Sequence, residues 1–130
     1  MVWVDIVGLA AVVQLMVFGM LVGSARSRYG IQAPATTGHP VFEAYFRVQA
    51  NTIELLVAFL PALWLAGNYW SARYAALTGA LYLVGRVLYL LGYVRDPKQR
   101  GPGFALSFTP IVVLIVAALI GALRALHALG

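Results

Sequence analysis

The sequence predicts an all-α integral membrane protein, a bundle of four transmembrane helices. Of the 130 residues, 62% are hydrophobic and only 10% are charged, and the mean hydropathy is +0.88. A soluble domain carries about 25% charged residues, so this chain has too few to cover a water-facing surface. Four apolar stretches each approach the roughly 20 residues that a helix needs to cross the hydrocarbon core. Alternating barrel-strand patterning is absent, which leaves helices as the spanning elements.

The first apolar stretch, 6–23, contains no charged residue. A cleaved signal peptide would begin with a positively charged segment. Here the only charge before the stretch is that of Asp5, and the stretch is long. We therefore expect a retained helix.

The other three stretches differ in how many polar residues they hold. Stretch 46–67 is apolar only in its later part, stretch 74–94 holds a single charge, and stretch 104–123 holds none. Short connections rich in proline and glycine separate them. We expect helices at about 3–23, 43–67, 73–95 and 104–128, in one domain that covers 1–130.

The basic residues predict the orientation of the bundle. Four spans place the connections 24–40 and 95–103 on one side and both termini on the other. The two connections hold five basic residues, which are Arg26, Arg28, Arg95, Lys98 and Arg100, whereas the opposite side holds Arg73 and Arg124. The positive-inside rule then places the connections 24–40 and 95–103 in the cytoplasm.

Polar residues in the second helix form a stripe. Arg47, Asn51 and Glu54 are spaced i, i+4 and i+7, which places them on one face, whereas Gln49 points about 200° away from Arg47. A charged side chain at the bilayer centre costs at least about 2.5–3.5 kcal/mol on insertion scales, so such residues face the bundle interior and mark a site.

A second stripe follows the third helix, where Tyr82, Arg86, Tyr89 and Tyr93 share one face. One interpretation is structural: Glu54 and Arg86 would form an ion pair, and the tyrosines an interfacial belt. The other is a shared polar pocket, which the number of polar groups favours. A positive pocket with one carboxylate suits a ligand with several carboxylates and one ammonium group, and glutathione has this chemistry.

The start of the second helix resembles a known family. Phe42-Glu43 followed by Arg47-x-x-x-Asn51-x-x-Glu54 is similar to the signature of the MAPEG family, the membrane-associated proteins in eicosanoid and glutathione metabolism. The block 82–93 resembles the third helix of that family. The similarity is strongest to the branch that contains the leukotriene-conjugating synthase and the microsomal glutathione transferases.

This resemblance implies a homotrimer with glutathione bound between adjacent subunits. It assigns the glutathione pocket to Arg47, Asn51, Glu54, Arg86, Tyr89 and Tyr93, with Gln49 and Arg26 reaching it from a neighbouring subunit. It matches Arg100 to the arginine that stabilises the glutathione thiolate.

The resemblance also implies an activity: a glutathione transferase, with glutathione as co-substrate, that conjugates the thiolate to lipophilic electrophiles. Peroxidase activity towards lipid hydroperoxides is an associated expectation. Ser27 and Leu55 depart from the leukotriene-conjugating enzyme, which argues against the same lipid substrate. Gly101 departs from the prostaglandin-isomerising branch, which argues against isomerase chemistry. The chain has no cysteine, so glutathione brings the nucleophile. We expect no metal site and no nucleic-acid partner.

Two other functions remain open at this point. A non-catalytic member of the family would bind and present a lipid. A small four-helix multidrug exporter would use Glu54 as its proton-coupled residue. The presence of Arg100 together with Arg47, Asn51 and Glu54 favours the enzyme.

Overall fold

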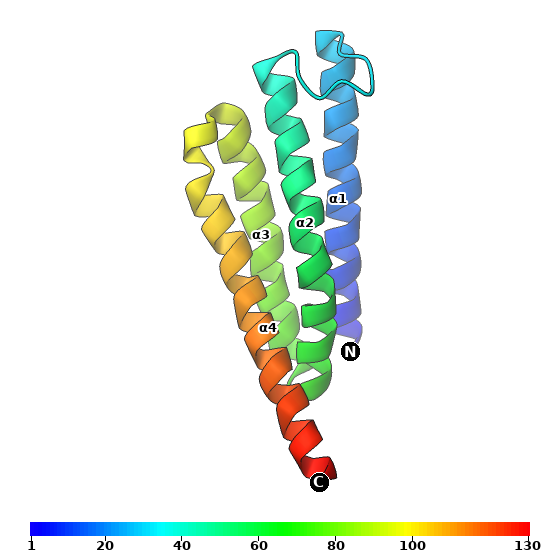
Figure 1. The fold of residues 1–130 in the computed structure, drawn as a ribbon, viewed down its shortest axis with the longest axis vertical. Coiled ribbons are helices and arrows are strands. Elements are labelled where there is room, and N and C mark those ends of the chain that lie inside the picture. Colours follow the sequence, from blue (N-terminus) through cyan, green and yellow to red (C-terminus); the bar gives the residue numbers. More distant parts are fainter.

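The computed structural model describes all 130 residues as four long α-helices and one short 3-10 helix (Figure 1). The elements are α1 (Val2–Tyr29), α2 (Pro40–Tyr69), α3 (Ala72–Arg95), η1 (Pro97–Gln99) and α4 (Gly101–Leu129). The chain contains no strand, and its 4 long helices are all long and apolar enough to cross a membrane. The predicted fold class, an all-α four-helix membrane bundle, is confirmed.

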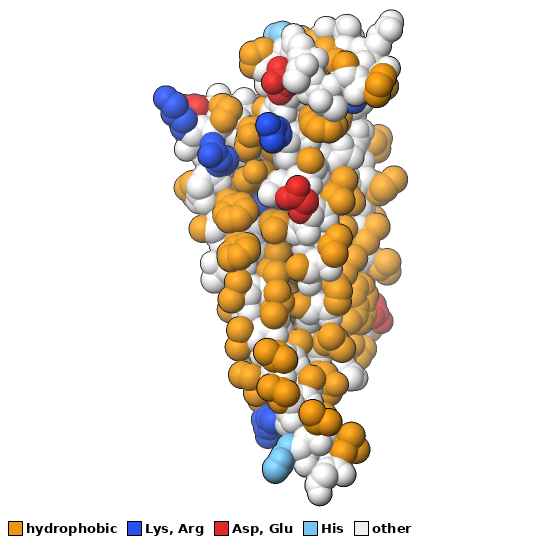
Figure 2. Space-filling model, in the orientation of Figure 1, with side chains coloured by type: hydrophobic (Ala, Val, Ile, Leu, Met, Phe, Trp, Pro, Cys, Tyr) orange, Lys and Arg blue, Asp and Glu red, His pale blue; other side chains and the backbone are white.

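The helices run side by side, with α2 in contact with each of the other three (Figure 1). The loop between α1 and α2 and the η1 connection between α3 and α4 lie at one end of the bundle, and both termini lie at the other. Hydrophobic side chains cover most of the face shown in Figure 2, as expected for a surface in contact with lipid.

The first connection is shorter than the sequence predicted, because α1 continues past residue 23 to Tyr29. Hydropathy falls after residue 23, yet nothing breaks the helix before Gly30, which closes it with a left-handed φ of 65°. At the other side of the loop, His39 Nδ1 accepts a hydrogen bond from the N–H of Val41 (3.1 Å), and α2 begins at Pro40. Arg26 therefore lies on the last turn of a helix rather than in a loop.

Two glycines allow α3 and α4 to approach closely near the connection end. A Cβ atom at Gly85 would lie 2.6 Å from the backbone nitrogen of Ser107. A Cβ atom at Gly103 would collide with the backbone of Tyr89. Small residues at such contacts let helix backbones approach each other in membranes. This contact places Ser107 beside the face of α3 that carries Arg86.

We expect Gly103→Ala to destabilise the bundle, because the added methyl group forces α3 and α4 apart. Overpacking of this kind costs about 1–3 kcal/mol. Thermal unfolding in detergent, followed by circular dichroism, should show a midpoint several degrees lower than that of the wild type. Gly101→Ala is the matched control, since a Cβ there meets nothing within 4 Å. Equal midpoints for the two variants would contradict the close contact.

Candidate functional site

Arg86 lies at the centre of the polar groups and links three helices. Its Nε donates to Ser107 Oγ of α4 (2.9 Å), and its Nη1 donates to Asn51 Oδ1 (2.7 Å) and Thr52 Oγ1 (3.1 Å) of α2. Its guanidinium carbon lies 4.3 Å from the centroid of the Tyr89 ring. Arg86 has no solvent exposure, so within one subunit it is a buried cross-link.

The two hydroxyl groups that bind Arg86 are themselves oriented by their own helices. Ser107 Oγ donates to the carbonyl of Gly103 (2.7 Å), and Thr52 Oγ1 donates to the carbonyl of Val48 (2.7 Å). Each hydroxyl donates its hydrogen bond to the carbonyl four residues earlier in its helix. Its oxygen lone pairs are therefore free to accept hydrogen bonds from the guanidinium. Two neighbouring helices therefore present acceptors to one buried cation.

The ion pair between Glu54 and Arg86, one of the two interpretations of the sequence, does not form. The hydrogen bonds of Arg86 go to neutral groups, and its Nη2 is buried without a partner. Glu54 is exposed on the outer surface of α2. The reason is geometric, because the face of α2 that meets α3 carries Thr52 and one edge of Asn51, whereas Glu54 is rotated outward.

Asn51 connects the buried cross-link to the outer face of α2. Its side chain is half-buried, and its Oδ1 accepts from Arg86. An amide whose oxygen faces a guanidinium must turn its NH2 group the other way. Arg86 therefore fixes the orientation of Asn51 and leaves the donor of Asn51 available.

The outer face of α2 carries two exposed charges, Arg47 and Glu54. Neither has a hydrogen-bond or ion-pair partner within the subunit. Arg47 lines a cleft of about 280 Å³ between the start of α2 and the connection after α3, together with Tyr93 and Pro97. On its other side, Arg47 borders a second cleft with the loop residues Thr36 and Thr37.

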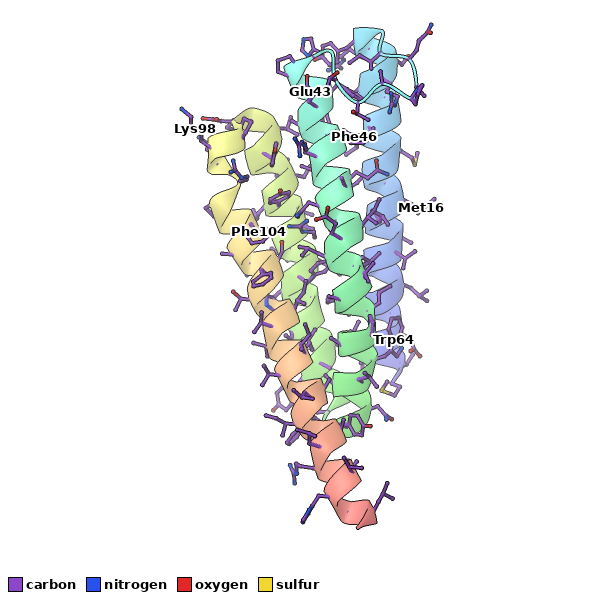
Figure 3. All side chains as sticks on the ribbon, in the orientation of Figure 1. Met16, Glu43, Phe46, Trp64, Lys98 and Phe104 are labelled. Carbon is purple, nitrogen blue, oxygen red and sulfur yellow. The ribbon has the colours of Figure 1, made fainter.

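Charged side chains gather at this end of the bundle (Figure 2). Figure 3 labels Glu43 at the start of α2 and Lys98 in the α3–α4 connection, both at this end. Glu43 also lines both clefts, and its Oε2 accepts from the N–H of Gly38 (3.2 Å). One acidic side chain at the entrance thus holds the loop that precedes α2.

Arg100 reaches the same region from the connection between α3 and α4. Its Nη1 donates to the carbonyl of Pro97 (2.7 Å), a residue that lines the cleft with Arg47. Its guanidinium carbon lies 6.0 Å from the ring centroid of Tyr93, and the Tyr93 ring lies 5.5 Å from that of Tyr89. Arg100 does not line the cleft itself, but it contacts Pro97 and the Tyr93 ring, two residues that line the cleft with Arg47.

Arg26 and Gln49 lie on the side of the subunit where α1 meets α2. Arg26 Nη1 donates to the carbonyl of Ala35 (2.6 Å), and its guanidinium carbon lies 4.8 Å from the Phe42 ring centroid. Gln49 packs against α1, where a Cβ at Gly19 would lie 2.9 Å from Gln49 Nε2. Within one subunit these two residues are separate from the cleft, so their contact with it from a neighbour stays a prediction.

Sequence reasoning missed two residues of this arrangement, Thr52 and Ser107. Both lie in apolar helices, where a hydroxyl is satisfied by its own helix. Only their positions in the sequence could have pointed to them, since Thr52 follows Asn51 and Ser107 lies one turn after Gly103. Neither signal gives the rotation of one helix against another, which decides their contact with Arg86.

Comparisons with known proteins agree with the sequence motifs. The chain matches the model of the MAPEG family over residues 5–120, which extend from α1 into α4. It is 41% identical over 128 residues to an uncharacterized protein of Synechocystis sp., a match that covers 98% of this chain and 93% of the relative. It is 39% identical over 117 residues to microsomal glutathione S-transferase 2 of Homo sapiens, covering 90% and 78% of the two chains. It is 38% identical over 106 residues to leukotriene C4 synthase of Bos taurus, covering 82% and 71%.

Proposed function

The chain belongs to the MAPEG family, and from this premise we propose that it is a membrane-bound glutathione transferase. Two relatives, a microsomal glutathione S-transferase and a leukotriene C4 synthase, support a glutathione-dependent transferase. The substrate proposed for this chain is a lipophilic electrophile that arrives through the bilayer. Glutathione is the co-substrate and supplies the nucleophilic sulfur.

The observation that carries this proposal is the cleft lined by Arg47, Tyr93 and Pro97, with Arg100 in contact with the last two. Glutathione has two carboxylates and one ammonium group. Guanidinium groups bind carboxylates through paired, charge-assisted hydrogen bonds, and Arg47 is exposed with no partner in the subunit. Glu54, two turns deeper on the same face, is a carboxylate that can take the ammonium group. Tyr93 and the NH2 group of Asn51 supply hydrogen bonds for the peptide groups between them.

We further propose that the site is completed by a neighbouring subunit in a homotrimer. Glu54 lies near the middle of α2, and its neighbours Ile53 and Val57 are 47% and 72% exposed. A carboxylate that faced lipid at that depth would cost several kcal/mol. A second subunit on this face would remove that cost, and its own Arg26 and Gln49 are the groups proposed to reach the ligand. From the positive-inside rule we propose that the end with the basic connections lies in the cytoplasm.

The proposed chemistry depends on the ionisation of the glutathione sulfur. A free thiol has a pKa near 8.5 and is mostly protonated at neutral pH. The guanidinium of Arg100 beside the sulfur would favour the thiolate and lower that pKa. The thiolate then forms a carbon–sulfur bond with the electrophile. The bond to the leaving group breaks, and the leaving group departs with the electron pair.

The same thiolate could reduce a lipid hydroperoxide. Its sulfur would attack the terminal peroxide oxygen, the oxygen–oxygen bond would break, and the lipid alcoholate would take a proton from water. A second glutathione would then convert the sulfenic acid to glutathione disulfide and release water. We propose this as an accompanying activity.

A conjugation assay separates this proposal from its alternatives. The purified protein in detergent is mixed with glutathione and a chromogenic aryl halide, and glutathione binding is measured separately by equilibrium dialysis. We expect saturable binding and conjugation faster than in buffer. Binding without conjugation would indicate the non-catalytic lipid-presenting protein. No binding of glutathione, with proton-coupled drug transport in liposomes, would indicate the exporter.

Arg47→Ala should weaken glutathione binding by roughly 10- to 100-fold, the range expected when a charge-assisted hydrogen bond is lost. Equilibrium dialysis measures the change directly. Arg73→Ala is the control, because Arg73 is an exposed arginine at the start of α3, at the opposite end of the bundle. An unchanged affinity in Arg47→Ala would remove Arg47 from the site.

A further inference from the structure

A second cavity lies at the opposite end from the cleft, between the α2–α3 turn and the second half of α4. It has a volume of about 850 Å³. Its lining combines aromatic, apolar and cationic side chains, among them Tyr69, Trp70, Thr78, Val113, Ala117 and Arg124. It shares no residue with the cleft at Arg47. We propose that this cavity binds an anionic phospholipid, with Arg124 at the phosphate and one acyl chain along the groove towards Val113.

The mouth of the cavity carries a fixed cation. Trp70 Nε1 donates to the carbonyl of Ala117 (2.7 Å), which anchors the indole ring between the turn and α4. The guanidinium carbon of Arg124 lies 4.9 Å from the centroid of that ring. An arginine held over an anchored indole is restrained in position, yet its donors remain available for an anion.

No acidic group of the subunit neutralises Arg124. The one acidic residue in the helix turns at this end is Asp5, and its Oδ1 accepts from Trp64 Nε1 (2.7 Å) on the far side of α2. A zwitterionic lipid such as phosphatidylcholine offers a phosphate whose charge is already offset by its own ammonium group, so its complex with Arg124 would keep a net positive charge. A lipid with a net negative headgroup is therefore the complementary occupant.

The depth of the groove matches an acyl chain. Arg124 lies 11 positions after Val113 on α4. At 1.5 Å per residue, this separation is about 16 Å along the helix axis. Half of the hydrocarbon core of a bilayer is about 15 Å. The groove thus extends from the interface, where Tyr69 and Trp70 lie, to the middle of the membrane. The hydroxyl of Thr78 in its wall already donates to the carbonyl of Tyr74 (2.9 Å), so it requires no polar partner from the lipid.

Native mass spectrometry of the detergent-purified full chain tests this site. The protein is titrated with phosphatidylglycerol or phosphatidylcholine of identical acyl chains, and the bound lipids are counted. We expect a preference for phosphatidylglycerol of about fivefold, the factor for one arginine near an anionic lipid surface. Arg124→Gln should abolish this preference, and Arg124→Lys should retain most of it. If the wild type showed no preference for phosphatidylglycerol over phosphatidylcholine, the proposal would be overturned. The same result is expected if another subunit covers the groove, and it would overturn the proposal equally.

Two controls assign the effect to this cavity. Arg73→Gln removes a charge at the same end of the bundle but outside the cavity lining, and should leave the preference unchanged. An equal loss in Arg73→Gln and Arg124→Gln would indicate a general surface attraction and overturn the site. Excess inorganic phosphate should not displace phosphatidylglycerol, and displacement would indicate an anion site without a groove for the chain. Glutathione binding should be the same in all these variants, which keeps this test independent of the proposed function.

Discussion

Replacing Arg100 by alanine should lower the rate of conjugation by about 100- to 1000-fold while glutathione binds with nearly unchanged affinity. Loss of one group that stabilises a developing or reacting anion has effects of this size. Arg100 is hydrogen-bonded to Pro97, a lining residue of the cleft, whereas the proposed carboxylate contact belongs to Arg47. The measurement is kcat with an aryl halide, compared with the dissociation constant of glutathione.

The pH dependence adds a second readout for Arg100. Because the thiolate is the reactive form, the rate rises with pH through the pKa of bound glutathione. Without the guanidinium this pKa should move up towards the free-thiol value near 8.5, so the variant should recover part of its activity in alkaline buffer. Lys98→Ala is the matched control, since Lys98 is an exposed cation of the same connection, whereas it is Arg100 whose guanidinium lies over the Tyr93 ring. Equal losses of binding and rate in Arg100→Ala would reduce Arg100 to ligand capture.

The double substitution Thr52→Val and Ser107→Ala should destabilise the bundle by roughly 3–5 kcal/mol. Both changes preserve side-chain volume closely, but they remove two of the three acceptors of Arg86 and leave a buried guanidinium with Asn51 alone. Breaking the partners of a buried charge has an effect of this size. Thermal or denaturant unfolding in detergent measures the loss.

The same two substitutions in an Arg86→Met background distinguish lost hydrogen bonds from an unpaired charge. There the charge is gone, so we expect Thr52→Val and Ser107→Ala to have only a small further effect. Thr78→Val is a second control, because Thr78 makes the same bond to its own helix, to the carbonyl of Tyr74, and has no arginine beside it. An equal loss of stability with and without Arg86 would show that the cross-link contributes nothing.

Arg86→Met should also weaken glutathione binding even though Arg86 is buried. Its loss frees the side chain of Asn51, whose oxygen it holds. We expect a smaller effect than that of Arg47→Ala, measured by the same equilibrium dialysis. Affinity equal to the wild type would mean that the orientation of Asn51 does not depend on Arg86.

Much of the fold could be predicted from the sequence, because composition and the length of apolar stretches are enough to define four spans. The helix ends could not be predicted as well. Hydropathy reports where the membrane environment ends, whereas α1 continues through Arg26 to Gly30, the first residue that breaks it. A helix can extend beyond the membrane, so the two boundaries need not coincide.

For the site, periodicity could predict which residues share a face of one helix, but it could not predict the contacts between helices. The spacing of Arg47 and Glu54 correctly placed both on one face of α2, but the expectation that this face turns to the bundle interior was wrong, because both side chains are exposed in the subunit. The ion-pair interpretation was wrong about the partner of Arg86. It chose Glu54 by opposite charge alone, whereas the rotation of the two helices decides whether the side chains meet. The actual partners depend on the close contact at Gly85 and Gly103, which no periodicity reports.

The most direct test is the ultraviolet difference spectrum of glutathione thiolate on the purified wild-type protein at neutral pH. We expect a thiolate band that saturates with glutathione and decays at the rate of conjugate formation when an aryl halide is added. The Arg100→Ala variant should bind glutathione without this band. Saturating glutathione that produces no thiolate band on the wild-type protein would contradict the proposed transferase.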